Sequence, residues 1–405
     1  CSTAVIRFVW KSARIAEERK HMERTATNEK RKYMILGIAV FFLLAFRSIS
    51  VQAVTFERIP NACDYINEQE EQLAEGIDFT LEWCEAYTMD SNELLRYFQM
   101  QGGFVIGTIQ VTKHEDKTVD VHLEPYYYPG VRVAYAWRSG DTSFLTSEER
   151  SLYDYCMDIA NDAYLVSNTD LEREKYIHDF ICDRVVYKTD ETTDSTMPVP
   201  RHKTAIGAFF DGEANCQGYT DLFYVLATMA GFEVRKQIGG DWNWAEQSDN
   251  NHIWNVIKLD GKWYQVDVTW DDQEHSDAPY IYANFNFAPD WSDGHGWGSF
   301  GLCAPFDWCI DQNYFYYSEL GVCASDYATL AQKVYDYKCN HPNESQVHAM
   351  YIGGQLDTAA FDNAMKDYAN QFSRWVNWSY RVYTIRFDNP EQWNSFLVVT
   401  WNQFG

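Results

Sequence analysis

The chain has 405 residues, enough for two or three domains that each bury their own core. Aromatic residues make up 17% of it, which excludes a mainly disordered chain. The formal net charge is −26, and beyond residue 53 the chain holds 23 Lys and Arg against 55 Asp and Glu. This acidity repels phosphate backbones and most simply serves solubility, so nucleic acid is a poor candidate partner.

Residues 1–53 have the pattern of a leader with a signal peptide. Lys30-Arg31-Lys32 precedes an apolar run from Met34 to Phe46, which Arg47 interrupts well short of the roughly 20 apolar residues of a spanning helix. Val51-Gln52-Ala53 then offers a cleavage site. We therefore expect a secreted or cell-surface protein that meets a membrane only through this signal peptide or through an uncleaved N-terminal anchor.

Residues 54–140 are predicted to form an N-terminal α+β accessory region. Ile77–Leu81 and Val119–Leu123 alternate between apolar and polar residues like half-buried strands, and Ser91–Met100 is predicted as a helix between them.

Residues 141–340 are expected to form the catalytic domain, in which two helices precede the candidate site. Thr146 with Glu149, and Thr169 with Glu172, are capping boxes followed by apolar residues at helical spacing.

The candidate nucleophile of this domain is Cys216. Its neighbour Asn215 is a good N-cap, and the following apolar residues lie on one face of a helix that Gly231 ends. Cys216 therefore lies in a first turn, where the helix dipole favours a thiolate. That effect is worth about 0.3–1 kcal/mol, less than one pKa unit, whereas an ordinary thiol has a pKa near 8.5. An imidazole partner is needed.

His252 is that partner, because a predicted hairpin places it beside Asp267. Residues 252–259 and 262–270 alternate like strands, and Asp260-Gly261 between them is a strong two-residue turn signal. In this register His252, Trp254 and Asp267 share one face, with His252 and Asp267 diagonal neighbours about 7–8 Å apart. The opposite face, which includes Trp270, is apolar and is expected to pack on the core.

The three residues have distinct expected roles. Cys216 attacks an amide carbon, His252 moves the proton, and Asp267 orients the imidazole. The backbone N–H of Cys216 is the first expected donor to an oxyanion. Weak candidates for the second donor or for substrate binding lie nearby: Gln217, Trp242, Trp244 and Trp254. The aromatic residues from 242 to 308 either line a binding groove or fill a loop-rich core, and the core is slightly favoured.

Other polar residues of this domain are interpreted as structural or solvated. His178 lies in the middle of a predicted helix and is taken as a surface residue. The acidic run Asp271-Asp272-Gln273-Glu274 could hold a cation, but a solvated loop is favoured. No metal or cofactor is expected.

Cysteines other than Cys1 and Cys216 are even in number, which fits up to four disulfides in an exported protein and equally fits buried thiols. A zinc site is disfavoured, because no Cys-x-x-Cys spacing occurs. The eight are Cys63, Cys84, Cys156, Cys182, Cys303, Cys309, Cys323 and Cys339.

Residues 341–405 are predicted to form a C-terminal β-α-β-β unit. The expected elements are a strand at Val347–Ile352, a helix at Thr358–Tyr368 and strands at Tyr380–Phe387 and Phe396–Trp401.

With these motifs in order, residues 145–275 resemble the transglutaminase-like superfamily, particularly its secreted bacterial members. The resemblance rests on Asn215-Cys216-Gln217-Gly218-Tyr219, His252-Ile253-Trp254-Asn255 and Val266-Asp267-Val268-Thr269-Trp270-Asp271. It implies an α+β fold with a papain-like core of helices packed on an antiparallel sheet, and a Cys-His-Asp triad for acyl transfer at amide bonds. Nothing resembles the calcium-binding domains of animal cross-linking enzymes.

Two functions follow from this resemblance. The first is an exported cysteine enzyme that hydrolyses or transamidates peptide, protein or cell-wall amides through a thioester. The alternative is a catalytically silent cell-surface binding module with the same fold.

Overall fold

The computed structural model describes most of the chain after residue 53, and nearly all described residues fall in one compact unit, residues 55–405. The predicted signal peptide lies outside the described residues. The described ranges are 54–82, 85–100, 107–188, 199–239, 242–243, 248–249, 252–272, 281–287, 314–319, 322–372, 376–386 and 393–404.

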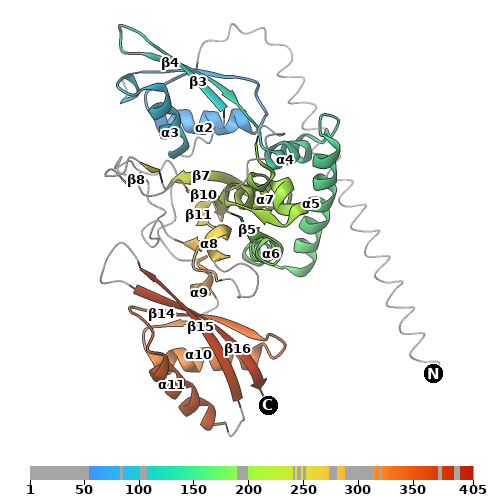
Figure 1. The fold of residues 1–405 in the computed structure, drawn as a ribbon, viewed down its shortest axis with the longest axis vertical. Helices are drawn as coiled ribbons and strands as arrows, with labels where there is room; N and C mark the ends of the chain where they lie inside the picture. Colours follow the sequence, from blue (N-terminus) through green and yellow to red (C-terminus); the bar gives the residue numbers. More distant parts are fainter. Residues whose placement is uncertain are drawn as a thin grey trace, which may run out of the picture. The chain divides into compact units, whose positions relative to one another are not determined.

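The N-terminal part is a four-stranded sheet with helices on one face (Figure 1). Inward-facing residues such as Phe79 and Val121 alternate with exposed ones such as Asp78 and Asp120, and the inward set packs on both helices. The sheet has the order β1-β2-β4-β3, and its elements are β1 (Val54–Phe56), α2 (Ile59–Glu70), β2 (Ile77–Leu81), η1 (Glu85–Tyr87), α3 (Ser91–Met100), β3 (Gly107–Lys113) and β4 (Val119–Pro125).

The central part is built around helix α7 (Cys216–Met229), in which every residue from Gly218 to Met229 is buried. Helices α4, α5 and α6 contact it, and so do strands β7 and β10 of an antiparallel sheet with the order β12-β11-β10-β7. Figure 1 shows α7 between these helices and the sheet. The elements around α7 are α4 (Pro129–Ser139), α5 (Ser147–Val166), α6 (Asp170–Cys182), β7 (Glu233–Gly239), β10 (His252–Leu259), β11 (Lys262–Val266) and β12 (Phe285–Phe287).

Short elements complete this part. They are β5 (Val186–Tyr187), η2 (Arg201–Lys203), η3 (Gly207–Asp211), β6 (Glu213–Ala214), β8 (Trp242–Asn243), β9 (Ser248–Asp249), α8 (Val268–Asp271) and α9 (Tyr316–Glu319). β5 pairs with β6 in parallel, and β8 pairs with β9 antiparallel.

The C-terminal part is a third four-stranded sheet, in the order β13-β14-β16-β15, packed against two helices. Its elements are β13 (Cys323–Ala324), α10 (Tyr327–Asn340), β14 (Gln346–Ile352), α11 (Thr358–Asn370), β15 (Val376–Arg386) and β16 (Trp393–Phe404). The predicted helix and strands after residue 341 lie within these elements, except that Phe387, the predicted end of one strand, lies outside the described residues.

Two elements are grouped differently from the predicted regions. Helix α4 lies in the predicted N-terminal region, but Val133 and Ala136 are part of the central core. Helix α10 lies in the predicted catalytic domain, but Leu330 and Val334 pack in the core of the C-terminal sheet. The fold class itself is confirmed, since the chain is α+β with helices packed on an antiparallel sheet.

Candidate active site

Cys216 is the first residue of α7, as predicted, because Asn215 caps the helix. The Asn215 side chain accepts hydrogen bonds from the backbone N–H groups of Gln217 at 3.0 Å and Gly218 at 3.4 Å. A Cβ atom on Gly218 would lie 2.5 Å from the carbonyl oxygen of His202, so only glycine lets η2 approach this turn. Cap and close approach together fix Cys216, which is partly exposed, at the helix start.

The hairpin that carries His252 has the predicted register. Leu259 pairs with Lys262 and Asn255 with Val266. The turn residues Asp260 and Gly261 have φ values of 48° and 79°, the left-handed conformation that a two-residue hairpin turn needs.

The second strand is shorter than predicted, which changes how Asp267 is presented. β11 ends at Val266, and Asp267 becomes the N-cap of α8 by accepting a hydrogen bond from Trp270 N at 3.2 Å. The prediction of a strand to Trp270 is wrong, because this cap satisfies backbone groups that the alternating pattern had assigned to a strand. Asp267 therefore approaches His252 from a strand end.

The imidazole of His252 interacts with both other candidate residues, Asp267 and Cys216. Its Nε2 atom lies 2.5 Å from Oδ2 of Asp267, and the Cys216 thiol is its other hydrogen-bonding partner. Burial lowers the pKa of His252, but the Asp267 carboxylate and the thiol outweigh it and raise this pKa to about 10. The structure thus brings together the three residues predicted as a triad.

Two tryptophan rings lie nearly parallel to this imidazole. The ring of Trp270 is 4.6 Å away between centroids, and that of Trp254 is 5.8 Å away. Trp270 was predicted on the opposite, core-facing side, and the turn into α8 brings it to His252 instead. Its position could have been found only by recognising Asp267 as a helix cap.

The weak substrate-binding candidates are less well supported by their positions. Trp254 is 1% exposed and its Nε1 donates to Gln265, so it offers no surface to a substrate. Gln217 is partly buried next to the nucleophile. Of Trp242 the structure describes only the backbone, in β8, and Trp244 lies outside the described residues, as do Trp291, Trp297 and Trp308.

His178 and the first two residues of the acidic run, Asp271 and Asp272, are buried, contrary to prediction, while Gln273 and Glu274 lie outside the described residues. His178 and Asp271 have no exposed surface, and Asp272 is 7% exposed. His178 Nε2 lies 3.1 Å from Asp271 Oδ2, and Asp271 also accepts from the backbone and side-chain nitrogens of Asn284. The prediction of a surface histidine is wrong, and so is that of a solvated loop for Asp271 and Asp272, since each of these groups has a partner far away in sequence.

The sequence left open whether eight cysteines form disulfides or remain thiols. Of these, Cys156, Cys182 and Cys323 are thiols without a disulfide. Cys63 is buried too, and its sulfur lies 3.7 Å from the carbonyl oxygen of Phe98. Cys84, Cys303 and Cys309 lie outside the described residues.

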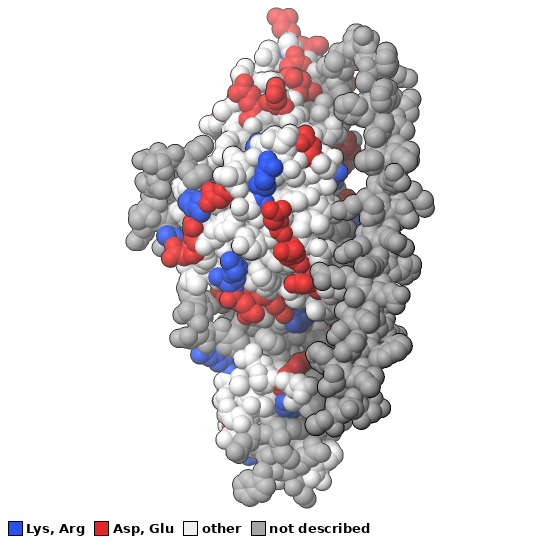
Figure 2. Space-filling model, turned by 90° about the vertical axis from the view of Figure 1, so that its right-hand side faces the viewer, with Lys and Arg blue, Asp and Glu red and all other residues white. Residues whose placement is uncertain are grey.

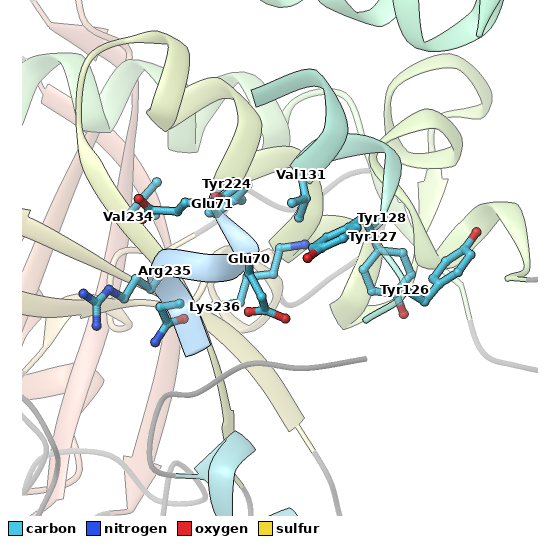
Figure 3. Close-up of a pocket in the computed structure, with 11 residues that line it drawn as sticks. Glu70, Glu71, Tyr126, Tyr127, Tyr128, Val131, Tyr224, Val234, Arg235 and Lys236 are labelled. Carbon is cyan, nitrogen blue, oxygen red and sulfur yellow. The ribbon is translucent and has the colours of Figure 1, made fainter. Parts of the chain in front are cut away.

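A separate pocket borders β7 and α4 (Figure 3). Lys236 forms part of its wall, with its ammonium 2.6 Å from Asp221 and about 5 Å from the ring centroids of Tyr128 and Tyr224. No triad residue lines it. The pocket is therefore distinct from the Cys216 site.

The central region matches a known family. Residues 158–268 match the family model of the transglutaminase-like superfamily, a stretch that contains all three candidate residues. The resemblance found in the sequence is thereby confirmed, and the central region is transglutaminase-like.

Particular relatives are distant. The kyphoscoliosis peptidase of Homo sapiens is 26% identical over 144 residues, and that of Mus musculus is 24% identical over 140 residues. Each match covers 32% of this chain and 21% of the relative, so the chain spans about a fifth of those proteins. The periplasmic domain of TgpA from Pseudomonas aeruginosa is 15% identical, with 38% of this chain and 55% of that chain covered and a TM-score of 0.24.

Proposed function

We propose that this chain is a cysteine acyl-transfer enzyme acting on amide bonds of peptides, proteins or cell-wall material. The observation that carries the proposal is the position of His252, which interacts with both the Cys216 thiol and the Asp267 carboxylate. A binding module has no need of an imidazole placed between a thiol and a buried carboxylate. The peptidase names of the two mammalian relatives support the same chemistry.

In the proposed reaction Cys216 passes its proton to His252 and attacks the amide carbonyl carbon. The resulting oxyanion lies at the helix start, where the backbone N–H of Cys216 has no partner within the helix. The C–N bond breaks, and imidazolium His252 gives its proton to the leaving amine. Water or a primary amine then attacks the thioester while His252 takes its proton, and the thiolate leaves.

Asp267 orients the imidazole during these steps and stabilises its charged form whenever His252 holds the second proton. Because it accepts from His252 through Oδ2 and from Trp270 N through Oδ1, its carboxylate cannot rotate freely. The stacked ring of Trp270 covers one part of the imidazole and excludes water there.

The proposal places this enzyme outside the cytoplasm, supported by the basic residues and apolar run within residues 1–53. Within the part of the chain that the structure describes, no helix is long and apolar enough to cross a membrane. On the face drawn in Figure 2, acidic side chains are interspersed with Lys and Arg. Such a mixed, mainly acidic surface supports a peptide or cell-wall substrate over nucleic acid.

Peptide libraries test the reaction. Incubation with the full chain, with and without a primary amine, is expected to give cleaved or amine-linked peptides by mass spectrometry, and which product forms separates hydrolysis from transamidation. Cys216→Ala is expected to abolish both products, and Cys323→Ala, a matched loss of another thiol, is expected to retain them. Products that persist in Cys216→Ala would contradict the proposal.

A further inference from the structure

Helix α8 is a single turn, yet it and its N-cap supply two groups that contact His252, the Asp267 carboxylate and the Trp270 ring. Asp267 caps its start, and Trp270 lies within it. A turn of four residues has no stability of its own, because helix nucleation costs more than one hydrogen bond returns. Its position must therefore come from tertiary contacts.

The first contact is an ion pair with α6. Asp271, the last residue of α8, lies 3.1 Å from His178, and neither side chain is exposed. The other ring nitrogen of His178 lies 3.2 Å from Asp179, which itself pairs with Lys175 at 2.6 Å. Although burial lowers it, the pKa of His178 is well above its usual value, because the neighbouring thiol and the two carboxylates favour the imidazolium. The contacts with Asp271 and Asp179 thus favour the charged form of His178 in the core.

Opposite charges lie next to one another in this cluster, which allows the pair to persist in the core. His178 and Lys175 offset Asp179 and Asp271. The nearby Glu174 is buried, and burial raises its pKa to about 8, so it is mostly neutral at neutral pH. A buried pair of this kind costs desolvation, and losing one partner leaves the other uncompensated.

The second contact joins α8 to the nucleophile's own helix. Tyr219, three residues after Cys216 and one helical turn away, donates its hydroxyl hydrogen to Asp272 Oδ2 at 2.5 Å. The same hydroxyl lies 3.0 Å from the carbonyl oxygen of Val185. Tyr219 is 1% exposed, so water does not compete for this hydrogen bond. The nucleophile helix and the turn that carries Asp267 are thus directly linked.

We propose that the His178–Asp271 and Tyr219–Asp272 contacts are two tethers that position α8, and that they hold Asp267 and Trp270 against His252. His178 and Tyr219 are then positioning residues of the site: they contact no reacting atom and act through α8. This inference rests on the proposed function, since it concerns the same triad.

The test is the pH profile of kcat/KM for peptide cleavage or amine transfer. Loss of a tether lets Asp267 move from the imidazole, so the alkaline limb, which reports loss of imidazolium His252, moves to lower pH. His252 faces the Cys216 thiol, the Asp267 carboxylate and the two tryptophan rings. For Tyr219→Phe and Asp271→Asn we expect the limb to fall by about one pH unit, and thus kcat/KM on that limb to fall about tenfold.

Two reference variants make the outcome decisive. Tyr224→Phe removes another buried hydroxyl from α7, remote from α8, and is expected to keep the wild-type profile. Asp267→Asn removes the carboxylate itself and is expected to give the largest shift of the alkaline limb. If circular dichroism shows that Asp271→Asn does not fold, the pH profile of Tyr219→Phe, which keeps the aromatic ring, alone decides the tether proposal.

The outcomes separate the two proposals. If the limb shifts in Asp267→Asn and in Tyr219→Phe but not in Tyr224→Phe, the tethers are supported. If it shifts in Asp267→Asn while Tyr219→Phe and a folded Asp271→Asn keep the wild-type profile, the tether proposal is overturned and the triad stands. If even Asp267→Asn keeps the wild-type profile, the triad fails, and the tethers fail with it.

Discussion

His252 pairs with Asp267 at the start of α8, and His178 pairs with Asp271 at its end. A cysteine accompanies each pair, Cys216 beside His252 and Cys182 at 3.9 Å from His178. The same three residue types therefore occur twice in one small region. Their surroundings differ, and the difference separates a reactive site from a structural one.

Position in the helix and access to solvent account for that difference. Cys216 begins α7 and is partly exposed, so the helix dipole favours its thiolate and a substrate can approach it. Cys182 ends α6, where the dipole disfavours negative charge, and burial raises its pKa to about 12. A catalytic set is thus defined by helix polarity and access more than by residue identity.

The largest expected difference between the two sets lies in their thiols. Cys216→Ala should lower kcat/KM for the peptide substrate by at least about 10³-fold, because it removes the nucleophile. Cys182→Ala should leave kcat/KM within about twofold, since the buried thiol acts as a small apolar side chain. Steady-state kinetics of both purified variants check this. A comparable loss in Cys182→Ala would erase the proposed distinction.

The two histidines should differ in which property they change most, stability for His178 and activity for His252. His178→Ala leaves Asp271 buried without its cation, which should lower the free energy of unfolding by about 3–5 kcal/mol in urea titrations. His252→Ala should lower kcat/KM by about 10³-fold or more while changing unfolding less than His178→Ala does. Equal destabilisation by the two variants would argue against a mainly structural role for His178.

Local sequence signals predicted the parts of the site that depend on nearby residues. The Asn215 cap, the capping boxes at Thr146 and Thr169 and the Asp260-Gly261 turn are each decided within a few residues, and all are present. The turn also fixed the register that places His252 near Asp267, because a two-residue hairpin leaves one pairing.

The features that the sequence did not predict depend mainly on contacts between residues far apart in the chain or on helix ends without a local signal. His178 was expected at the surface because its partner Asp271 is 93 residues away. The end of β11 was misplaced because residues 267–270 alternate like a strand, and only the cap by Asp267 turns the chain. The missed helix α2 has no side-chain N-cap, so it lacked the local start signal that marked α5 and α6.

The stability of the fold should depend on pH through His252. Its pKa is raised to about 10 in the folded chain, against about 6.5 when unfolded, so the charged imidazole stabilises the fold. This contribution is complete below about pH 6.5 and disappears as the pH rises toward 10. Guanidinium unfolding of wild type and His252→Gln should therefore show a larger difference at pH 6 than at pH 10. His178, present in both proteins, cancels, and a pH-independent difference would contradict the raised pKa.

The smallest expected effect belongs to the Trp270 ring, which is stacked 4.6 Å from the imidazole of His252 between centroids. Trp270→Leu removes a stacked partner worth about 0.5–1.5 kcal/mol, so kcat/KM should fall about 2- to 10-fold. Trp263→Leu, on the other strand of the hairpin and away from the imidazole, is the matched control and should have no effect on kcat/KM. A null result for Trp270→Leu would limit the ring to packing.

Alkylation of individual cysteines tests the central claim most directly. At pH 6 the account predicts that iodoacetamide labels Cys216 at least about tenfold faster than the exposed Cys339, as followed by peptide mass spectrometry, while Cys182 stays unlabelled. His252→Ala should reduce the Cys216 rate to that of Cys339. Equal rates for Cys216 and Cys339 in the wild-type chain would contradict a thiol activated by His252 and Asp267.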